Sequence, residues 1–503
     1  MLQQSILASC RTTDGLSGVF EHYATWTTVM DVCRHWRDVA VASPTLWSTI
    51  HVQRASYERL HPVLSLQRSS KCPLNVFLDL SANPEDMSPV LAQLPRVQGL
   101  HLEGDHRSLC SATRWAVHNL QALAIIGTYH RPDEGRSMWS RPMPAVFGGD
   151  LSTLHSLMIS RFEKYPDLTL VQLRRLHISD CSYHTRDQFA SLLRLLAGVP
   201  ALEELVFTDT TFRDWSLPGR RVDLSALRKL AFERSTSGTA HLLKCLELPG
   251  CVSLSFDIDE MAHPVHDRQY LPWDLSSLHN VEDLTSFNVT VDESRLIIEA
   301  TGDNAMFLWN SSWSVFDDRD LIGMSDLIDS ISVIFSQATS LCLHVCGWHP
   351  DYLHQHQWLR KILAASTNVL SLFLVAGNGY LAQKLLAAFD AEQEDEEQDG
   401  DVLCPYLQEL HVDVPGFEVY GDLLQILYWR NSEEPLSKLC VHMLLPPGSA
   451  GRVGPKSSLH RRIEDDLELL GDYADDVVVK RRSDMPVLAR TVSRAMAPEV
   501  CCV

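Results

Sequence analysis

The sequence predicts an α/β protein with a short helical head, a long array of strand-and-helix repeats and an inserted β-hairpin. Three observations favour this fold class. Residues 29–40 have the apolar spacing of one helix face, a short apolar strand pattern recurs from residue 94 onward, and residues 287–300 alternate with the period of two that is typical of paired strands. A strand that recurs over such a length favours one stacked array over several separate domains.

The head is predicted from a helix that ends at a proline. Its apolar positions recur at steps of three and four, which puts them on one helix face. Ser43-Pro44 ends the helix because proline disfavours helical backbone at the preceding residue. A helix this short does not bury Trp36 and Trp47 alone, so it needs a partner helix, the following domain or another protein. The apolar positions are Val29, Val32, Cys33, Trp36, Val39 and Ala40.

These residues resemble the second half of an F-box. Residues 32–40 read V-C-R-H-W-R-D-V-A and residues 43–47 read S-P-T-L-W, which matches the F-box helix and the segment after it in the variant used by the large F-box families of fungi. In the first half, Leu16, Val19 and Phe20 supply the helix positions, and Asp14-Gly15 stands where the family has Leu-Pro.

The F-box resemblance implies docking on the Skp-type adaptor of a cullin–RING ubiquitin ligase. Without the resemblance, the same segment is a plain amphipathic helix that caps the next domain. The residues that the resemblance assigns to adaptor binding are Leu16, Val19, Phe20, Val32, Cys33, Trp36, Pro44, Leu46 and Trp47.

The recurring strand pattern is L-x-x-L-x-[LIVF]. Its anchor leucines are 19 to 34 residues apart up to Leu254 and become irregular afterwards. A leucine-rich repeat has a period of about 20–29 residues, with one strand per repeat and a helical return. The array therefore resembles the irregular leucine-rich-repeat half of F-box proteins, which implies a solenoid that presents a binding surface. Copies lie at 94–102, 120–125, 154–159, 173–178, 202–207, 227–232, 407–412 and 436–441.

The alternating segment predicts a β-hairpin. Residues 287–291 and 296–300 flank a turn at Asp292-Glu-Ser-Arg295, and residues 306–309 offer a third strand. We interpret residues 284–316 as an insertion carried on the array. The predicted organisation is an F-box-like segment at 1–52, a linker or first irregular repeat at 53–93, the array at 94–445, and an irregular C-terminal segment at 446–503.

The composition of the chain indicates which binding partners and which cellular compartment to expect. The net charge is −21, which disfavours nucleic acid as a partner, and eight acidic residues fall in the single loop 390–401. The 13 cysteines are odd in number and irregularly spaced, and the N-terminus lacks the pattern of a signal peptide. We therefore expect a reducing compartment, cytoplasmic or nuclear, and no membrane partner.

The middle residue of each strand pattern is expected to face away from the core, toward a concave binding surface. Four of these residues are histidines, but they lie on strands too far apart to share a metal ion, so we expect no metal. No catalytic motif is present, and we expect neither an enzyme nor a cofactor. The residues predicted to contact an unknown protein substrate are His177, His344, Cys346, Phe373 and His411.

Three functions follow from these patterns. The first is a substrate-recognition subunit of a Skp–cullin–F-box type ubiquitin ligase. The second is a leucine-rich-repeat protein-interaction scaffold without ligase association. The third is an enzyme whose active site has no recognisable motif, which the absence of an activated nucleophile disfavours.

Overall fold

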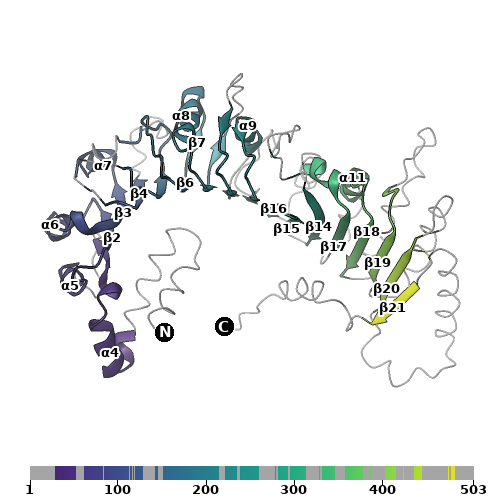
Figure 1. Ribbon diagram of the computed structural model, residues 1–503, viewed down its shortest axis with the longest axis horizontal. Helices are drawn as coiled ribbons and strands as arrows, with labels where there is room; N and C mark the ends of the chain where they lie inside the picture. Colours follow the sequence, from purple (N-terminus) through teal and green to yellow (C-terminus); the bar gives the residue numbers. More distant parts are fainter. Residues whose placement is uncertain are drawn as a thin grey trace, which may run out of the picture. The chain divides into compact units, whose positions relative to one another are not determined.

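The structure is a computed structural model that shows a mixed α/β fold with a large, mostly parallel sheet (Figure 1). The chain divides into two compact units, Met1–Cys181 with Ala190–Leu202, and Ser182–Phe189 with Glu203–Val503. The described residues are 29–52, 62–82, 84–112, 114–115, 117, 119–128, 142–144, 151–213, 221–234, 238–259, 278, 281, 283–292, 295–312, 328, 331–345, 357–377, 386, 403–414, 423, 427, 436–443, 474 and 477–481. The predicted site residues Leu16, Val19, Phe20 and Cys346 and the acidic loop 390–401 lie outside these ranges.

Among the described residues, the first unit has two short helices where the sequence predicted one. These are α3 (Val29–Val32) and α4 (Arg34–Val41), and Cys33 between them has extended backbone. The Cys33 carbonyl accepts the first hydrogen bond of α4, from the Arg37 amide at 3.1 Å, so the helix restarts there. The predicted end at Ser43-Pro44 is confirmed, because α4 stops at Val41 and the 3-10 helix η1 (Pro44–Trp47) follows.

A parallel sheet follows η1 directly. Its strands pair in chain order, each in parallel with the next. The sheet begins at Thr49, upstream of the predicted start at residue 94. The helices α5 (Pro62–Arg68), α6 (Pro84–Leu91) and α7 (His106–Ala112) lie on one face of these strands (Figure 1). The strands are β1 (Thr49–Val52), β2 (Leu74–Asp79), β3 (Val97–Gly104), β4 (Ala122–Gly127), β5 (Ser156–Ser160) and β6 (Arg175–Ser179).

The second unit continues the same kind of pairing. The parallel strands β8 (Glu204–Thr208), β11 (Lys229–Glu233) and β13 (Ser253–Asp259) adjoin one another. Further along the chain, five more strands pair in parallel and in order, and the last of them reaches beyond the predicted array end at 445. They are β17 (Ser340–Val345), β18 (Ser371–Ala376), β19 (Glu409–Val414), β20 (Lys438–Met443) and β21 (Val477–Arg481).

The predicted hairpin is present, and it is part of the sheet. β14 (Leu284–Val291) and β15 (Arg295–Gly302) pair antiparallel, and β16 (Met306–Ser312) pairs antiparallel with β15. β16 also pairs in parallel with β13, and β14 pairs in parallel with β17. The spatial order is therefore β13, β16, β15, β14, β17. The chain passes two strand positions and folds back to fill them, so the insertion continues the sheet.

The core repeats from strand to strand. The two apolar positions of each strand pattern are buried, as at Leu205 and Phe207 on β8. In the second unit, the rings of Phe207, Phe232 and Phe256 stack with centroids 5.4 and 5.1 Å apart. Each such side chain stabilises the fold by about 1.5–3 kcal/mol through burial. Because neighbouring strands supply the two sides of each layer, no single repeat buries its own apolar face.

The helical return α8 (Arg186–Ala197) shows how these segments begin and end. Its capping box is formed, because the Thr185 amide donates to Gln188 Oε1 at 2.8 Å and the Gln188 amide donates to Thr185 Oγ1 at 3.3 Å. Gly198 follows the helix, and a Cβ there would lie 2.1 Å from the Leu168 carbonyl oxygen. Only glycine permits that close backbone approach. In the ranges described above, no helix is long and apolar enough to cross a membrane.

Candidate functional site

The head presents apolar side chains to solvent. Val32 is 66% exposed and Val39 is 47% exposed, although both belong to the apolar set of the predicted helix face. Trp36 between them is half-buried, and Cys33 is exposed.

Trp47 is buried, in contrast to Val32 and Val39. Its side chain is fully buried, its indole N–H donates a 2.8 Å hydrogen bond to the Ala40 carbonyl, and the Arg68 guanidinium lies 4.2 Å from its ring centroid. Pro44 and Leu46 beside it are half-buried. Trp47 therefore joins α4 to α5 and to the first strand. It holds the head in place and does not itself present a docking surface.

Side chains at alternate strand positions form rows across the sheet of the first unit, on the face opposite the leucine core. What we call the first row consists of Thr49, Asn75, Gly99, Ala122, Ser156 and Arg175. The second row consists of His51, Phe77, His101, Ala124, Met158 and His177. The third row over β2 to β5 consists of Asp79, Glu103, Ile126 and Ser160.

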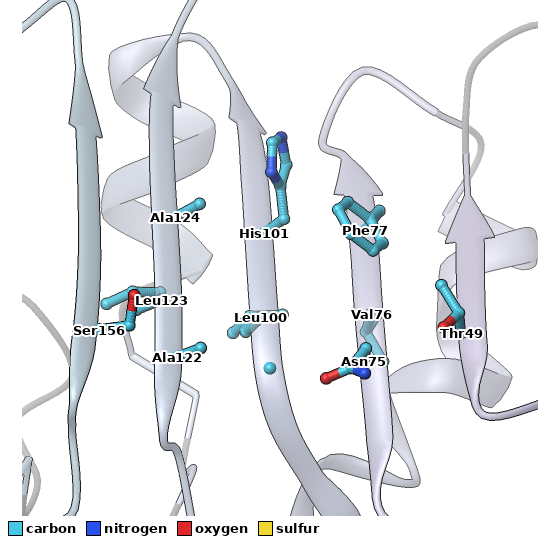
Figure 2. Close-up of a pocket in the computed structure, with 11 residues that line it drawn as sticks. Thr49, Asn75, Val76, Phe77, Leu100, His101, Ala122, Leu123, Ala124 and Ser156 are labelled. Atoms are coloured by element: carbon cyan, nitrogen blue, oxygen red, sulfur yellow. The ribbon is translucent and has the colours of Figure 1, made fainter. Parts of the chain in front are cut away.

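A groove of about 210 Å³ lies along the first row and against the second row (Figure 2). Its floor is strand backbone, because Gly99, Ala122 and Ala124 are too small to cover β3 and β4. The Asn75 side chain reaches over β3, since a Cβ at Gly99 would lie 2.3 Å from Asn75 Oδ1. The groove therefore combines small side chains with the Asn75 carboxamide and the hydroxyl groups of Thr49 and Ser156.

Two rings, Phe77 and His101, line this groove, and His51 lies on the other side of Phe77. His51 and Phe77 stack with centroids 4.5 Å apart and planes 4° apart, and Phe77 and His101 lie 5.1 Å apart. Burial lowers the pKa of His51 to about 4, with a smaller contribution from the charge of His101, and burial also lowers the pKa of His101 to about 4. Both imidazoles are neutral at pH 7. The two rings that line the groove are therefore uncharged.

The second unit carries a related row. Cys342, Phe373, His411 and Cys440 are paired across β17 to β20, and the rings of Phe373 and His411 stack at 4.2 Å. His411 Nε2 lies 3.4 Å from Glu409 Oε2. Of the predicted substrate residues, the structure brings Phe373 and His411 together. His177 is a half-buried residue of the first unit.

His344 does not share that row. It is paired with Thr290 and Val375, two positions beyond the row of Phe373, and it is only 8% exposed. The sequence analysis took His344 as the middle residue of its strand pattern, because residues 341–345 alternate over their whole length and fit either register. The parallel pairing with β14 and β18 fixes the register that was observed. His101 is likewise 5% exposed, since neighbouring side chains of its own face cover it.

Two buried thiols are protonated at neutral pH. Burial raises the pKa of the Cys342 thiol to about 11 and that of Cys181 to about 12, so neither is a thiolate. Within the part of the chain that the structure describes, no three His, Cys, Asp or Glu side chains lie close enough together to hold a metal ion.

The sequence analysis did not predict that Glu163 is buried and has a raised pKa. Glu163 is buried in the turn after β5, and burial raises its pKa to about 8, against a smaller opposite effect of the Lys164 charge. The turn is held by the Tyr165 hydroxyl, which donates to the Phe162 carbonyl at 2.9 Å, and by the Met143 amide, which donates to the Lys164 carbonyl at 2.7 Å. A charged residue in a loop gives no signal of burial in the sequence.

None of the groove residues is among the predicted substrate contacts. Thr49, Asn75 and Phe77 lie on β1 and β2, which lack the recurring leucine pattern. Their alternation of apolar and polar residues was the available signal. Compared with protein-family models and with curated proteins, the chain has no match.

Proposed function

We propose that the chain is the substrate-recognition subunit of a Skp–cullin–F-box type ubiquitin ligase. In this proposal the head docks on the Skp-type adaptor, and a protein substrate binds the strand array, which is an irregular leucine-rich-repeat solenoid. The observation that carries the proposal is the F-box-like segment whose Val32 and Val39 side chains are exposed while Trp47 fixes it to the sheet.

In this proposal the chain performs no bond chemistry. The ligase's ubiquitin-loaded enzyme reaches a substrate held nearby, so an encounter between two molecules becomes effectively intramolecular. Such a role needs a defined distance between adaptor and substrate. The short connection supports this, because only Ser48 separates η1 from β1.

Substitution of the exposed Val32 and Val39 tests whether the head binds the adaptor. Purified chain is incubated with an immobilised Skp-type adaptor, and capture is compared with that of the double variant Val32→Asp, Val39→Asp. The control is Val171→Asp, since Val171 is an exposed valine of the first unit, outside the head. We expect the head variant to lose at least tenfold in capture and the control to lose less than twofold. A wild-type chain that is not captured, even with Leu-Pro placed ahead of Leu16, contradicts the proposal.

One observation favours a second function, a protein-interaction scaffold without ligase association. The extended backbone at Cys33 separates Val32 from Trp36 and Val39, whereas the F-box resemblance implies one continuous helix. In that case the adaptor is not captured by either chain, while binding to the array persists. The same pull-down, repeated with an array ligand, distinguishes the two functions.

A further inference from the structure

The helix α7 of the first unit carries a histidine and a cysteine one turn apart. Cys110 follows His106 by four residues, and side chains at that spacing lie on the same face of a helix. Leu109 and Ala112 are fully buried and anchor another side of the helix, whereas His106 and Cys110 are half-buried. The ring and the thiol are therefore held side by side where solvent reaches them.

A backbone carbonyl from a distant segment orients the His106 ring. His106 Nε2 lies 3.2 Å from the Pro142 carbonyl oxygen. A carbonyl oxygen only accepts hydrogen bonds, so Nε2 carries the hydrogen, and in the neutral imidazole Nδ1 is then the acceptor. The position of this carbonyl is itself fixed, because Pro142 forms a parallel bridge with Lys164 and the Met143 amide donates to the Lys164 carbonyl at 2.7 Å.

The acceptor nitrogen lies next to the thiol. His106 Nδ1 is 3.6 Å from Cys110 Sγ, and Nε2 is farther away at 3.9 Å. The thiol therefore donates to Nδ1, and imidazole is the side chain that most often serves as a general base. A nucleophile, a base within hydrogen-bond reach and a group that orients the base form the arrangement that activates a thiol. Cys110, His106 and the Pro142 carbonyl supply these three parts.

The half-buried thiol favours a small reactant that needs a proton for its leaving group. We propose that Cys110 is a modification site, at which a hydroperoxide oxidises the thiol to a sulfenic acid with His106 as base and then as acid. This site does not depend on adaptor binding by the head.

The step is balanced with hydrogen peroxide as the oxidant. The thiol proton moves to His106 Nδ1, and the sulfur attacks one peroxide oxygen, so that an S–O bond forms as the O–O bond breaks. The imidazolium returns the proton to the departing hydroxide, which leaves as water. The sulfur loses an electron pair and the peroxide gains it.

Other cysteines provide comparisons within the same molecule. Cys33 is exposed, Cys72 is half-buried like Cys110, and Cys181 is 1% exposed with a pKa that burial raises to about 12. Trypsin separates the four thiols, which fall in the peptides 12–34, 72–96, 108–114 and 176–186. One digest therefore reports the oxidation of each thiol separately.

The experiment exposes the reduced full chain to a pulse of hydrogen peroxide with dimedone, which traps sulfenic acid, and quantifies the product in each peptide by mass spectrometry. At pH 7 we expect Cys110 to be oxidised at least tenfold faster than Cys72 and at least threefold faster than the exposed Cys33. Cys181 is expected to stay unmodified in every folded chain, because its thiol is buried.

A substitution of the base tests its role. His106→Gln keeps an amide donor but has no basic nitrogen, and we expect it to slow oxidation of Cys110 at least tenfold and that of Cys33 less than twofold. The control is His155→Gln, which changes an exposed histidine of the same unit and is expected to leave both rates within twofold.

The pH profile separates a base from a merely structural residue. Between pH 7 and pH 8 we expect the wild-type rate at Cys110 to change less than twofold, because the ring accepts the proton from the protonated thiol. In His106→Gln only thiolate reacts, so the rate is expected to rise at least fivefold, as the thiolate fraction of a thiol with an ordinary pKa of about 8.5 does.

Four results overturn the inference. They are oxidation of Cys110 no faster than that of Cys72, equal rates in His106→Gln and His155→Gln, the same pH profile in wild type and His106→Gln, and a stronger preference for Cys110 over Cys33 with dithiobis(nitrobenzoate) than with peroxide. The last would show a site for bulky disulfides. The first is measured on wild type alone, so it stands whether or not a variant folds.

Discussion

The indole N–H of Trp47 donates a 2.8 Å hydrogen bond to the Ala40 carbonyl, and this bond closes the end of α4 onto the start of the sheet. The two residues are seven apart in the chain, and both are buried. The head is thereby packed against the first strand. A docking surface on α4 and a binding surface on the sheet can then act over a fixed distance.

The two tryptophans of the head are expected to differ in their contribution to stability. Trp47→Ala removes a fully buried ring, its hydrogen bond and its contact with Arg68, which costs about 3–5 kcal/mol of the free energy of unfolding. Trp36 is half-buried, so Trp36→Ala costs about 1 kcal/mol. Urea denaturation of the two variants measures both. Equal destabilisation would show that Trp47 is not the anchor.

The buried histidines His51 and His101 predict an acid-sensitive fold. The pKa of His51 and of His101 is about 4 in the folded chain against an ordinary 6.5. Between pH 6.5 and pH 4 the unfolded chain therefore binds protons that the folded chain does not, and the free energy of unfolding falls as pH falls. At about 1.4 kcal/mol per pKa unit, each histidine contributes on the order of 3 kcal/mol of this loss.

The histidine effect is measured as a difference between chains. Urea denaturation of wild type and His101→Phe is compared at pH 7 and pH 4.5. On going from pH 7 to pH 4.5, we expect the free energy of unfolding to fall by at least 1 kcal/mol less in His101→Phe than in wild type, because the variant has lost one of the two buried histidines. His35→Phe changes an exposed histidine and serves as the control. Parallel pH curves for wild type and His101→Phe would contradict the account.

Glu163 predicts sensitivity in the opposite direction. Its pKa is raised to about 8 in the folded chain from an ordinary 4.5. The folded chain therefore holds a proton that the unfolded chain releases, and the free energy of unfolding falls as pH rises from 4.5 through 8. Glu163→Gln keeps the size and shape of the side chain but has no carboxyl group that can ionise. We expect it to be more stable than wild type at pH 9 by on the order of 2 kcal/mol, and not at pH 4.

The Glu163 comparison has a matched control in the same unit. Glu203→Gln is measured at the same two pH values, since Glu203 is a side chain at the surface. We expect its difference from wild type to be independent of pH. If Glu163→Gln follows the same flat profile, the carboxyl is ionised in the folded chain.

The sequence located strands well where a local pattern defines them. The leucine pattern placed Leu157 and Ile159 on β5 and Leu230 and Phe232 on β11, and the alternation around Asp292 predicted the hairpin. The period of apolar residues is enough to predict such strands, because successive side chains of one strand point to opposite faces of the sheet. The capping box at Thr185 also depends only on residues close together in the sequence.

Features that depend on pairing between distant segments were not predictable in this way. The order β13, β16, β15, β14, β17 arises because the chain passes two positions and folds back, which no local pattern encodes. The register that separates His344 from Phe373 is set by neighbouring strands. The groove depends on the coincidence of Gly99 and Ala122 on adjacent strands, and each residue alone is unremarkable. The break at Cys33 shows that a correct apolar spacing does not ensure a continuous helix.

The measurement that tests the central claim most directly is isothermal titration calorimetry of the purified full chain with a purified Skp-type adaptor. The account predicts saturable one-to-one binding that is weakened at least tenfold in the variant Val32→Asp, Val39→Asp and retained in Val171→Asp. Absence of binding by a folded wild-type chain, or equal binding by all three chains, would contradict it.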